Sequence, residues 1–125
     1  MKKIVLDTNF LLVPYQFKVS IFTQLEGLVE GPCELLLPSG VLSELKKLSK
    51  GKGKEGGAAR FALKLVSAQK PREVKSSGNV DEWIFRFAKE EGAMVATNDR
   101  ILRDKLKKSG VKVISLRSRS RLGVI

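Results

Sequence analysis

The stretch KKIVLDTNFLL, residues 2–12, places a carboxylate between two apolar segments. The run from Lys3 to Leu6 has the length and composition of a short buried strand, which predicts a strand over residues 3–6. Asp7 follows at once, and the apolar residues of a helix predicted over residues 8–12 come two positions later. The first strand therefore ends at an acidic side chain.

Further apolar runs alternate with helical patterns along the chain. Strands are predicted at residues 35–37, 72–74, 93–97 and 111–116, and helices at residues 19–29, 39–49, 58–68, 79–91 and 98–110. Such alternation, with continuous apolar strand cores such as LLL and MVA, is typical of a parallel sheet covered on both faces. The sequence therefore predicts a single α/β domain over residues 1–116, followed by a basic tail over residues 117–125.

Two basic segments have compositions that do not favour packing. SKGKGKEGG, residues 49–57, is rich in glycine and lysine and is predicted to be a mobile loop. Its Lys50, Lys52 and Lys54 either contact phosphates or are simply solvated. The tail RSRSRLGVI alternates arginine and serine, and Arg117, Arg119 and Arg121 either bind a nucleic-acid backbone or solubilise a frayed end.

The charge balance favours a polyanionic partner. With 24 basic and 13 acidic residues the chain has a formal net charge of +11, which is typical of proteins that bind nucleic acid, although a ribosome-associated protein or a generally basic proteome gives the same excess. The chain has no histidine, so it lacks Ser-His-Asp and Cys-His nucleophiles and histidine-ligated zinc. Catalysis would have to use carboxylates, lysines, hydroxyls or a metal.

Cysteine content and hydropathy bear on location. Cys33 is the only cysteine, so no internal disulfide can form. The apolar runs are too short to span a bilayer, and the N-terminal stretch lacks the features of a signal peptide. These features predict a cytoplasmic protein.

Four acidic residues are predicted to lie at one edge of the sheet. Ligands of an open parallel sheet bind beyond the carboxyl ends of its strands, and Asp7 and Asp99 follow two of those ends. Glu44 and Asp81 each lie about 90° from the apolar stripe of a predicted helix, given about 100° per residue. Asp7 and Asp99 have an alternative role as helix N-caps, and Glu44 and Asp81 as solvated helix charges.

Four converging acids would repel one another and raise their pKa values unless a cation neutralised them. Carboxylate oxygens suit Mg²⁺ or Mn²⁺. Such a site performs metal-assisted hydrolysis of phosphodiesters. A basic surface around an acidic pocket is therefore the combination that a nuclease requires.

Three stretches carry the four acids in order: VLDTNFLL, PSGVLSELKKL and GNVDEWIFRFAKEEGAMVATNDRIL, the last with a D-x-x-I-x-x-x-A spacing at Asp81, Ile84 and Ala88. They resemble, in turn, the opening strand and first acid, the second motif, and the third and fourth motifs of the PIN-domain family of metal-dependent ribonucleases. The resemblance covers nearly the whole chain. Four motifs in order, at family-like intervals, make the resemblance fairly specific.

The resemblance implies a three-layer α/β/α sandwich with a central parallel sheet, and endonucleolytic cleavage of RNA with Mg²⁺ or Mn²⁺. Metal ligands and catalytic residues carried over from the family are Asp7, Glu44, Asp81 and Asp99. Asn9 and Thr97 would support them, or be turn and strand-end residues, and Glu82 would be a substitute ligand.

The resemblance also implies partners. Some relatives are toxins held inactive by a small antitoxin protein, and others process ribosomal RNA in pre-ribosomal particles. The family also forms homodimers, for which Leu11, Leu12 and Phe22 are candidate interface residues, although core packing accounts for them equally well. A function from another class remains open: a non-catalytic RNA-binding or ribosome-assembly factor on the same fold, whose acids would be remnants or caps.

Overall fold

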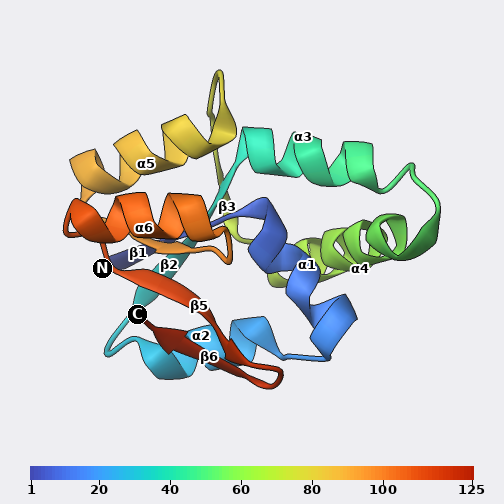
Figure 1. The fold of residues 1–125 in the computed structure, drawn as a ribbon, viewed down its shortest axis with the longest axis horizontal. Helices are drawn as coiled ribbons and strands as arrows, with labels where there is room; N and C mark the ends of the chain where they lie inside the picture. Colours follow the sequence, from blue (N-terminus) through green and yellow to red (C-terminus); the bar gives the residue numbers. More distant parts are fainter.

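The computed structural model describes all 125 residues, in six strands and six helices (Figure 1). The strands are β1 Lys2–Leu6, β2 Cys33–Pro38, β3 Arg72–Val74, β4 Met94–Ala96, β5 Val113–Ser118 and β6 Arg121–Val124. The helices are α1 Thr8–Phe17, α2 Ile21–Leu28, α3 Ser39–Leu48, α4 Gly53–Gln69, α5 Val80–Glu91 and α6 Arg100–Lys108.

The strands form one mixed sheet in the order β3-β2-β1-β4-β5-β6. All neighbours are parallel except β5 and β6. In the central register Val5 pairs with Leu36 on one side and with Val95 on the other. The parallel strands therefore end at a common carboxyl edge, where Asp7 and Thr97 emerge side by side.

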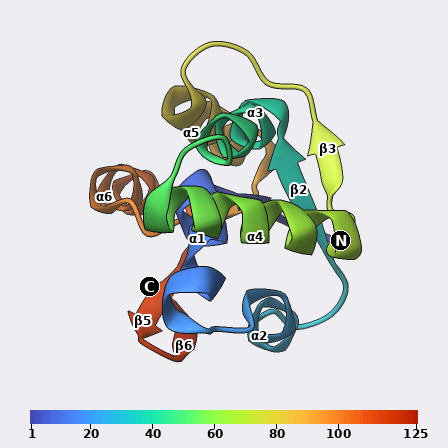
Figure 2. The ribbon, with the colours of Figure 1, turned by 90° about the vertical axis from the view of Figure 1, so that its right-hand side faces the viewer.

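Helices cover both faces of the sheet, which confirms the expected three-layer α/β/α sandwich. Helices α5 and α6 lie side by side near β4 and β5, whereas α1, α3 and α4 pack together as a second group (Figures 1 and 2). A cluster of 26 buried apolar residues joins the sheet to both groups, with the central strands β1 and β4 among its most buried parts. No helix combines the length and hydrophobicity needed to cross a membrane.

Helix α1 is longer than its sequence pattern predicts. It begins at Thr8 as expected but continues through Pro14 to Phe17, rather than ending at residue 12. Proline removes one helical N–H and crowds the preceding turn, yet Val13 and Pro14 are both buried. Packing of this turn against α4 offsets the lost hydrogen bond.

The predicted mobile loop at residues 49–57 is largely helical, because α4 begins at Gly53. Its glycines serve close packing. A Cβ on Gly56 would lie 2.0 Å from the carbonyl oxygen of Gly51, so no larger residue fits there. Arg60 adds two hydrogen bonds, donating Nη1 to the carbonyls of Ser49 (2.8 Å) and Gly51 (3.0 Å).

The predicted basic tail at residues 117–125 is part of the sheet. Arg117 and Ser118 complete β5, and Arg121–Val124 form β6, antiparallel to it. Gln24 of α2 holds the hairpin by donating to the carbonyl of Ser120 and accepting from the N–H of Leu122, both at 2.8 Å. The Arg/Ser segment spans the hairpin: Arg117 and Ser118 end β5, Arg119 and Ser120 form the turn, and Arg121 begins β6.

Candidate active site

Asp7 is the most buried of the four predicted acids, with 3% of its surface exposed. It caps α1, because Oδ1 accepts a hydrogen bond from the N–H of Thr8 at 2.8 Å. Its Oδ2 accepts from the hydroxyl of Thr97 at 2.6 Å. The expected alternative role as an N-cap is therefore present, and it leaves this carboxylate held at both oxygens at the carboxyl edge of the sheet.

Thr97 joins the first acid to the last. Its hydroxyl donates to Asp7 and accepts from the backbone N–H of Asp99 at 3.0 Å. Asp99 in turn caps α6 by accepting from the N–H of Leu102 at 3.1 Å through Oδ1. Its second oxygen accepts no hydrogen bond from the protein, so Asp99 caps the helix and still presents a free carboxylate oxygen.

Two asparagines fix the turn between β4 and α6. Asn9 Oδ1 accepts from the N–H of Asn98 at 2.9 Å. Asn98 Oδ1 accepts from the hydroxyl of Ser115 and from the N–H of Leu116, both at 2.8 Å. The sequence pattern singled out Asn9 and Thr97 as supporting residues but did not include Asn98 among them. Its position after an apolar strand, beside an acid, was the available signal.

Glu44 reaches the same edge from α3. Its Oε1 accepts a hydrogen bond from the hydroxyl of Thr8 at 3.0 Å. Thr8 directly follows Asp7, so its backbone contacts one acid while its side chain contacts another. Glu44 is otherwise exposed, and its second oxygen accepts no hydrogen bond from the protein.

Asp81 lies in the first turn of α5, and contacts between α3 and the segment preceding α5 bring it near Glu44. The hydroxyl of Ser39 accepts from the N–H of Ser76 at 2.8 Å, and Ser76 Oγ accepts from the N–H of Gly40 at 2.8 Å. A Cβ on Gly40 would lie 2.8 Å from a methyl of Val80. Sequence reasoning gave Ser76 and Gly40 no role, because their contacts join residues far apart in the chain.

The four acids interact electrostatically. Burial is the largest cause that raises the pKa of Asp7 to about 6; its two hydrogen bonds oppose the rise, and the charges of Asp81 and Glu44 add to it. Partial desolvation raises the pKa of Asp81 as well, reinforced by Asp99 and Glu44 and opposed by Lys105. Repulsion of this kind requires the four carboxyl groups to share one region.

None of the four carboxylates is neutralised by an ion pair, even though basic residues outnumber acidic ones. The ion pairs within 4.0 Å are Lys3–Glu91, Arg72–Glu34 and Arg103–Asp104. An all-oxygen donor set with free carboxylate oxygens has the chemistry that Mg²⁺ and Mn²⁺ prefer. The side chains do not, however, form a closed cluster of three or more ligands in this conformation, so binding would require them to move closer together.

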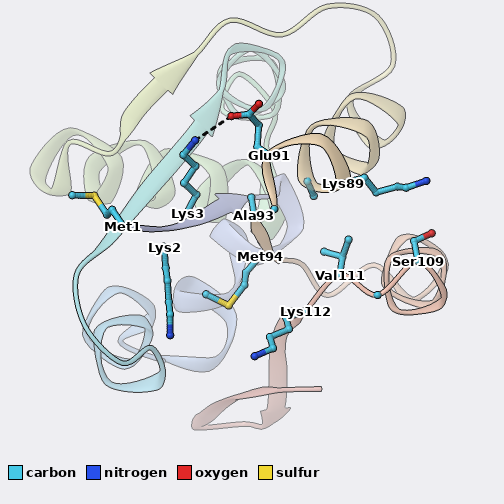
Figure 3. A pocket seen from close by; sticks show the side chains of 13 residues that line it. Met1, Lys2, Lys3, Lys89, Glu91, Ala93, Met94, Ser109, Val111 and Lys112 are labelled. Carbon is cyan, nitrogen blue, oxygen red and sulfur yellow. Dashed lines mark hydrogen bonds and ion pairs between the residues drawn. The ribbon is translucent and has the colours of Figure 1, made fainter.

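A large cavity lies at the opposite, amino edge of the sheet. It has a volume of about 630 Å³ and lies among the starts of β1 and β4 and the ends of α5 and α6. None of the four acids lines it. Figure 3 shows Lys3 directed to Glu91, whereas Lys89 points away from Lys2 and Lys112. Because these charged groups diverge, the cavity lacks a convergent binding site.

Other residues singled out from the sequence lie elsewhere. Glu82 faces a groove between α5 and α6, and it is absent from the groups that shift the pKa values of Asp7 and Asp81. Leu11 and Phe22 are buried in the core. The core-packing alternative therefore holds for them, and the prediction that they form a dimer interface is wrong. Leu12 is half-buried and packs against the same core.

Comparison with known proteins places the chain in a family. Residues 4–119 match the family model described as "PIN like domain". The chain is 34% identical to Ribonuclease VapC4 of Methanocaldococcus jannaschii, over 95% of this chain and 93% of that protein. It is 36% identical to Ribonuclease VapC9 of Archaeoglobus fulgidus, over 96% of this chain and 87% of that protein.

The fold has a close structural counterpart as well. The PIN domain endonuclease Utp24 superposes with a TM-score of 0.79 at 24% identity, covering 98% of this chain and 90% of that one. The similarity in fold extends over nearly the whole chain. The chain belongs to the PIN-like domain family.

Proposed function

We propose that this protein is a divalent-metal-dependent endoribonuclease that hydrolyses phosphodiester bonds of RNA. The observation that carries the proposal is the group of four carboxylates without ion pairs, which come from separate elements in a chain of net charge +11 and whose charges help to raise the pKa values of Asp7 and Asp81. Two relatives of similar length that are named ribonucleases support it.

In this proposal Asp7, Glu44, Asp81 and Asp99 would hold Mg²⁺ or Mn²⁺. The bound cation supplies a water of lowered pKa as nucleophile and neutralises charge that develops on the phosphate. Thr97 orients the carboxylate of Asp7 and fixes the backbone of Asp99, and Thr8 orients Glu44. These contacts hold the acids on the ends of rigid strands and helices.

The experiment is cleavage of labelled RNA with Mg²⁺ or Mn²⁺ by the wild type and by Asp7→Asn. The substitution removes one charge and keeps the shape of the side chain. Asp104→Asn is the matched control, since Asp104 is an exposed acid of α6, paired only with Arg103 at 4.0 Å. Cleavage that is lost in Asp7→Asn and kept in the control supports the proposal. Equal cleavage by all three proteins would refute it.

A non-catalytic RNA-binding factor is the second candidate, and the lack of a preformed cluster of three ligands favours it. Calorimetry separates the two functions. Binding of Mn²⁺ that disappears in Asp7→Asn supports the enzyme, whereas salt-sensitive RNA binding without any metal binding supports the second candidate.

Two biological settings fit the enzyme. One is a toxin restrained by a small antitoxin, and the other is processing of ribosomal RNA in a pre-ribosomal particle. Expression in a bacterial host tests the first. Growth arrest that requires Asp7 and is relieved by co-expression of a small neighbouring gene indicates a toxin. Absence of arrest, with selective cleavage of a ribosomal RNA precursor, indicates processing.

Cytoplasmic location and a homodimer belong to the same proposal, and sedimentation of the purified protein tests whether it is a homodimer.

A further inference from the structure

A second groove lies between α5 and α6 and is distinct from the large cavity at the amino edge of the sheet. It has a volume of about 350 Å³, and its lining is almost entirely charged. The residues of this α5–α6 groove are Glu82, Phe85, Arg86, Lys89, Glu90 and Lys105. The three basic residues outnumber the two acids, and α6 carries several further basic residues along its length.

The α5–α6 groove lies along the two helices that begin at the acidic edge, although none of the four acids lines it. Asp81, Phe85 and Lys89 are spaced four residues apart on α5, so they lie along one side of the helix. At 1.5 Å per residue this row is about 12 Å long. Helix α6 also begins at the acidic edge, with Asp99 as its cap, and packs beside α5 (Figure 1). The two neighbouring helices therefore connect the groove to the carboxylates.

Two ammonium groups converge on one aromatic ring in this groove. Lys105 Nζ lies 4.4 Å and Lys89 Nζ 5.1 Å from the centre of the half-buried Phe85 ring. Neither lysine has a carboxylate oxygen within 4.0 Å. Attraction to the ring face restrains both side chains. The pair is thus a positive site that forms no ion pair, although Glu82 and Glu90 also line the groove.

Lys105 also links the groove to the acids, because its charge opposes the rise in the pKa of Asp81. Lys89 lies about 12 Å from Asp81 along α5, so a strand bound at Lys89 and Lys105 would run along the helix towards that acid. Lys89 also lines the amino-edge cavity, but the other lysines there have no comparable arrangement, since Lys3 is directed to Glu91 and away from Lys2 and Lys112 (Figure 3). Positive charge beside the proposed phosphodiester-cleaving site is complementary to the phosphates of a nucleic-acid strand.

We propose that the α5–α6 groove binds the phosphate backbone of single-stranded RNA and leads it to the four carboxylates, with Lys89 and Lys105 as the phosphate contacts on Phe85. This inference rests on the proposed function, since it concerns the path of the same substrate. Lys89 and Lys105 act as positioning residues: they hold RNA and take no part in bond cleavage.

The test measures binding separately from cleavage. Fluorescence anisotropy of a fluorescein-labelled single-stranded RNA is recorded in EDTA over a range of NaCl concentrations. The variant is Lys89→Gln with Lys105→Gln. The matched control is Lys2→Gln with Lys112→Gln, because these exposed lysines lie at the opposite edge and change the net charge equally. Each lost phosphate contact lowers the slope of log affinity against log salt by about 0.7, so the groove variant should lose about 1.4.

The groove variant is expected to bind RNA about tenfold or more weakly than the control at low salt, and to need more RNA for half-maximal cleavage while keeping its rate at saturation. Phe85→Leu keeps both lysine charges, and its affinity for RNA should lie between those of the groove variant and the control. Equal affinity and slope in the groove variant and the control would overturn the inference, even if the wild type cleaves RNA. If the wild type binds RNA through the groove but does not cleave it, the inference stands and the nuclease proposal fails.

Discussion

The two edges of the sheet differ in size and in chemistry. The amino edge has a cavity of about 630 Å³, yet its charged groups diverge and its acid Glu91 is paired with Lys3 at 3.1 Å. At the carboxyl edge four acids lie without ion pairs, among hydrogen bonds from Thr8 and Thr97. The comparison teaches that convergent, unneutralised chemistry locates a site better than cavity volume does.

Substituting one acid at each edge should give the largest difference in RNA cleavage between the two edges. In Asp99→Asn the amide oxygen can still cap α6, so the fold is kept and one proposed ligand charge is lost. Because a bound metal stabilises the transition state by several kcal/mol, RNA cleavage should fall by about a hundredfold or more. Glu91→Gln at the amino edge should cleave like the wild type. A comparable loss in both variants would contradict the contrast between the edges.

Metal-free stability should depend on pH through Asp7. Its folded pKa of about 6 lies above the ordinary value of 3.8, so the folded protein retains a proton that the unfolded chain has released. The contribution of the Asp7 carboxyl group to stability is therefore fully present below about pH 4 and is lost as the pH rises through about 6. A shift of about two pKa units corresponds to about 3 kcal/mol at neutral pH.

The substitution Asp7→Asn should remove that decline, because the amide carries no charge to bury. Its nitrogen can donate to Thr97 Oγ1, and the Thr97 hydroxyl can turn to Asn9 Oδ1, 3.4 Å away. Urea unfolding in EDTA, from acidic to neutral pH, measures the effect. Asp7→Asn should be more stable than the wild type at neutral pH by up to about 3 kcal/mol. A less stable variant would show that the carboxylate is not strained.

Thr97 should be a positioning residue with a smaller effect on metal binding. Thr97→Val leaves Asp7 Oδ2 and the N–H of Asp99 without their partner. Loss of a contact that orients a ligand lowers metal affinity by about 10- to 100-fold. Calorimetry with Mn²⁺ measures this, and Thr97→Ser, which restores the hydroxyl, should recover most of the affinity. Equal affinities in the valine and serine variants would indicate that the hydroxyl does not act on the site.

The contrast between the edges was partly readable from the sequence. Asp7 directly follows β1, and Asp99 comes three residues after the end of β4; both lie at the expected edge of the sheet, and the signal that predicted this is local. The angular positions of Glu44 and Asp81 on their helices were also predicted from local sequence, by the helical periodicity. The contacts that bring these helices together are not: Ser39 meets Ser76, Thr8 meets Glu44, and Thr97 meets Asp7 across most of the chain.

The errors have the same origin. The glycines at residues 49–57 were read as flexible because composition does not reveal that Gly56 packs on the backbone of Gly51. The segment RSRSRLGVI was read as a tail because its partner, Gln24, lies almost a hundred residues away. Local composition therefore predicted most of the elements, and packing that composition does not reveal orders these two segments, over five residues at Gly56 and almost a hundred at Gln24.

The smallest expected effect concerns the ion pair of the amino edge. Lys3 and Glu91 are both partly solvated, and exposed pairs contribute about 0.2–1 kcal/mol because solvent screens them. A double-mutant cycle with Lys3→Gln and Glu91→Gln, followed by urea unfolding, should give a coupling in that range. The parallel cycle with Thr8→Val and Glu44→Gln should give a larger one, because a hydrogen bond to a charged group contributes about 1.5–3 kcal/mol. A stronger coupling for Lys3 and Glu91 than for Thr8 and Glu44 would mean that the amino edge, rather than the acidic one, carries the more organised electrostatics.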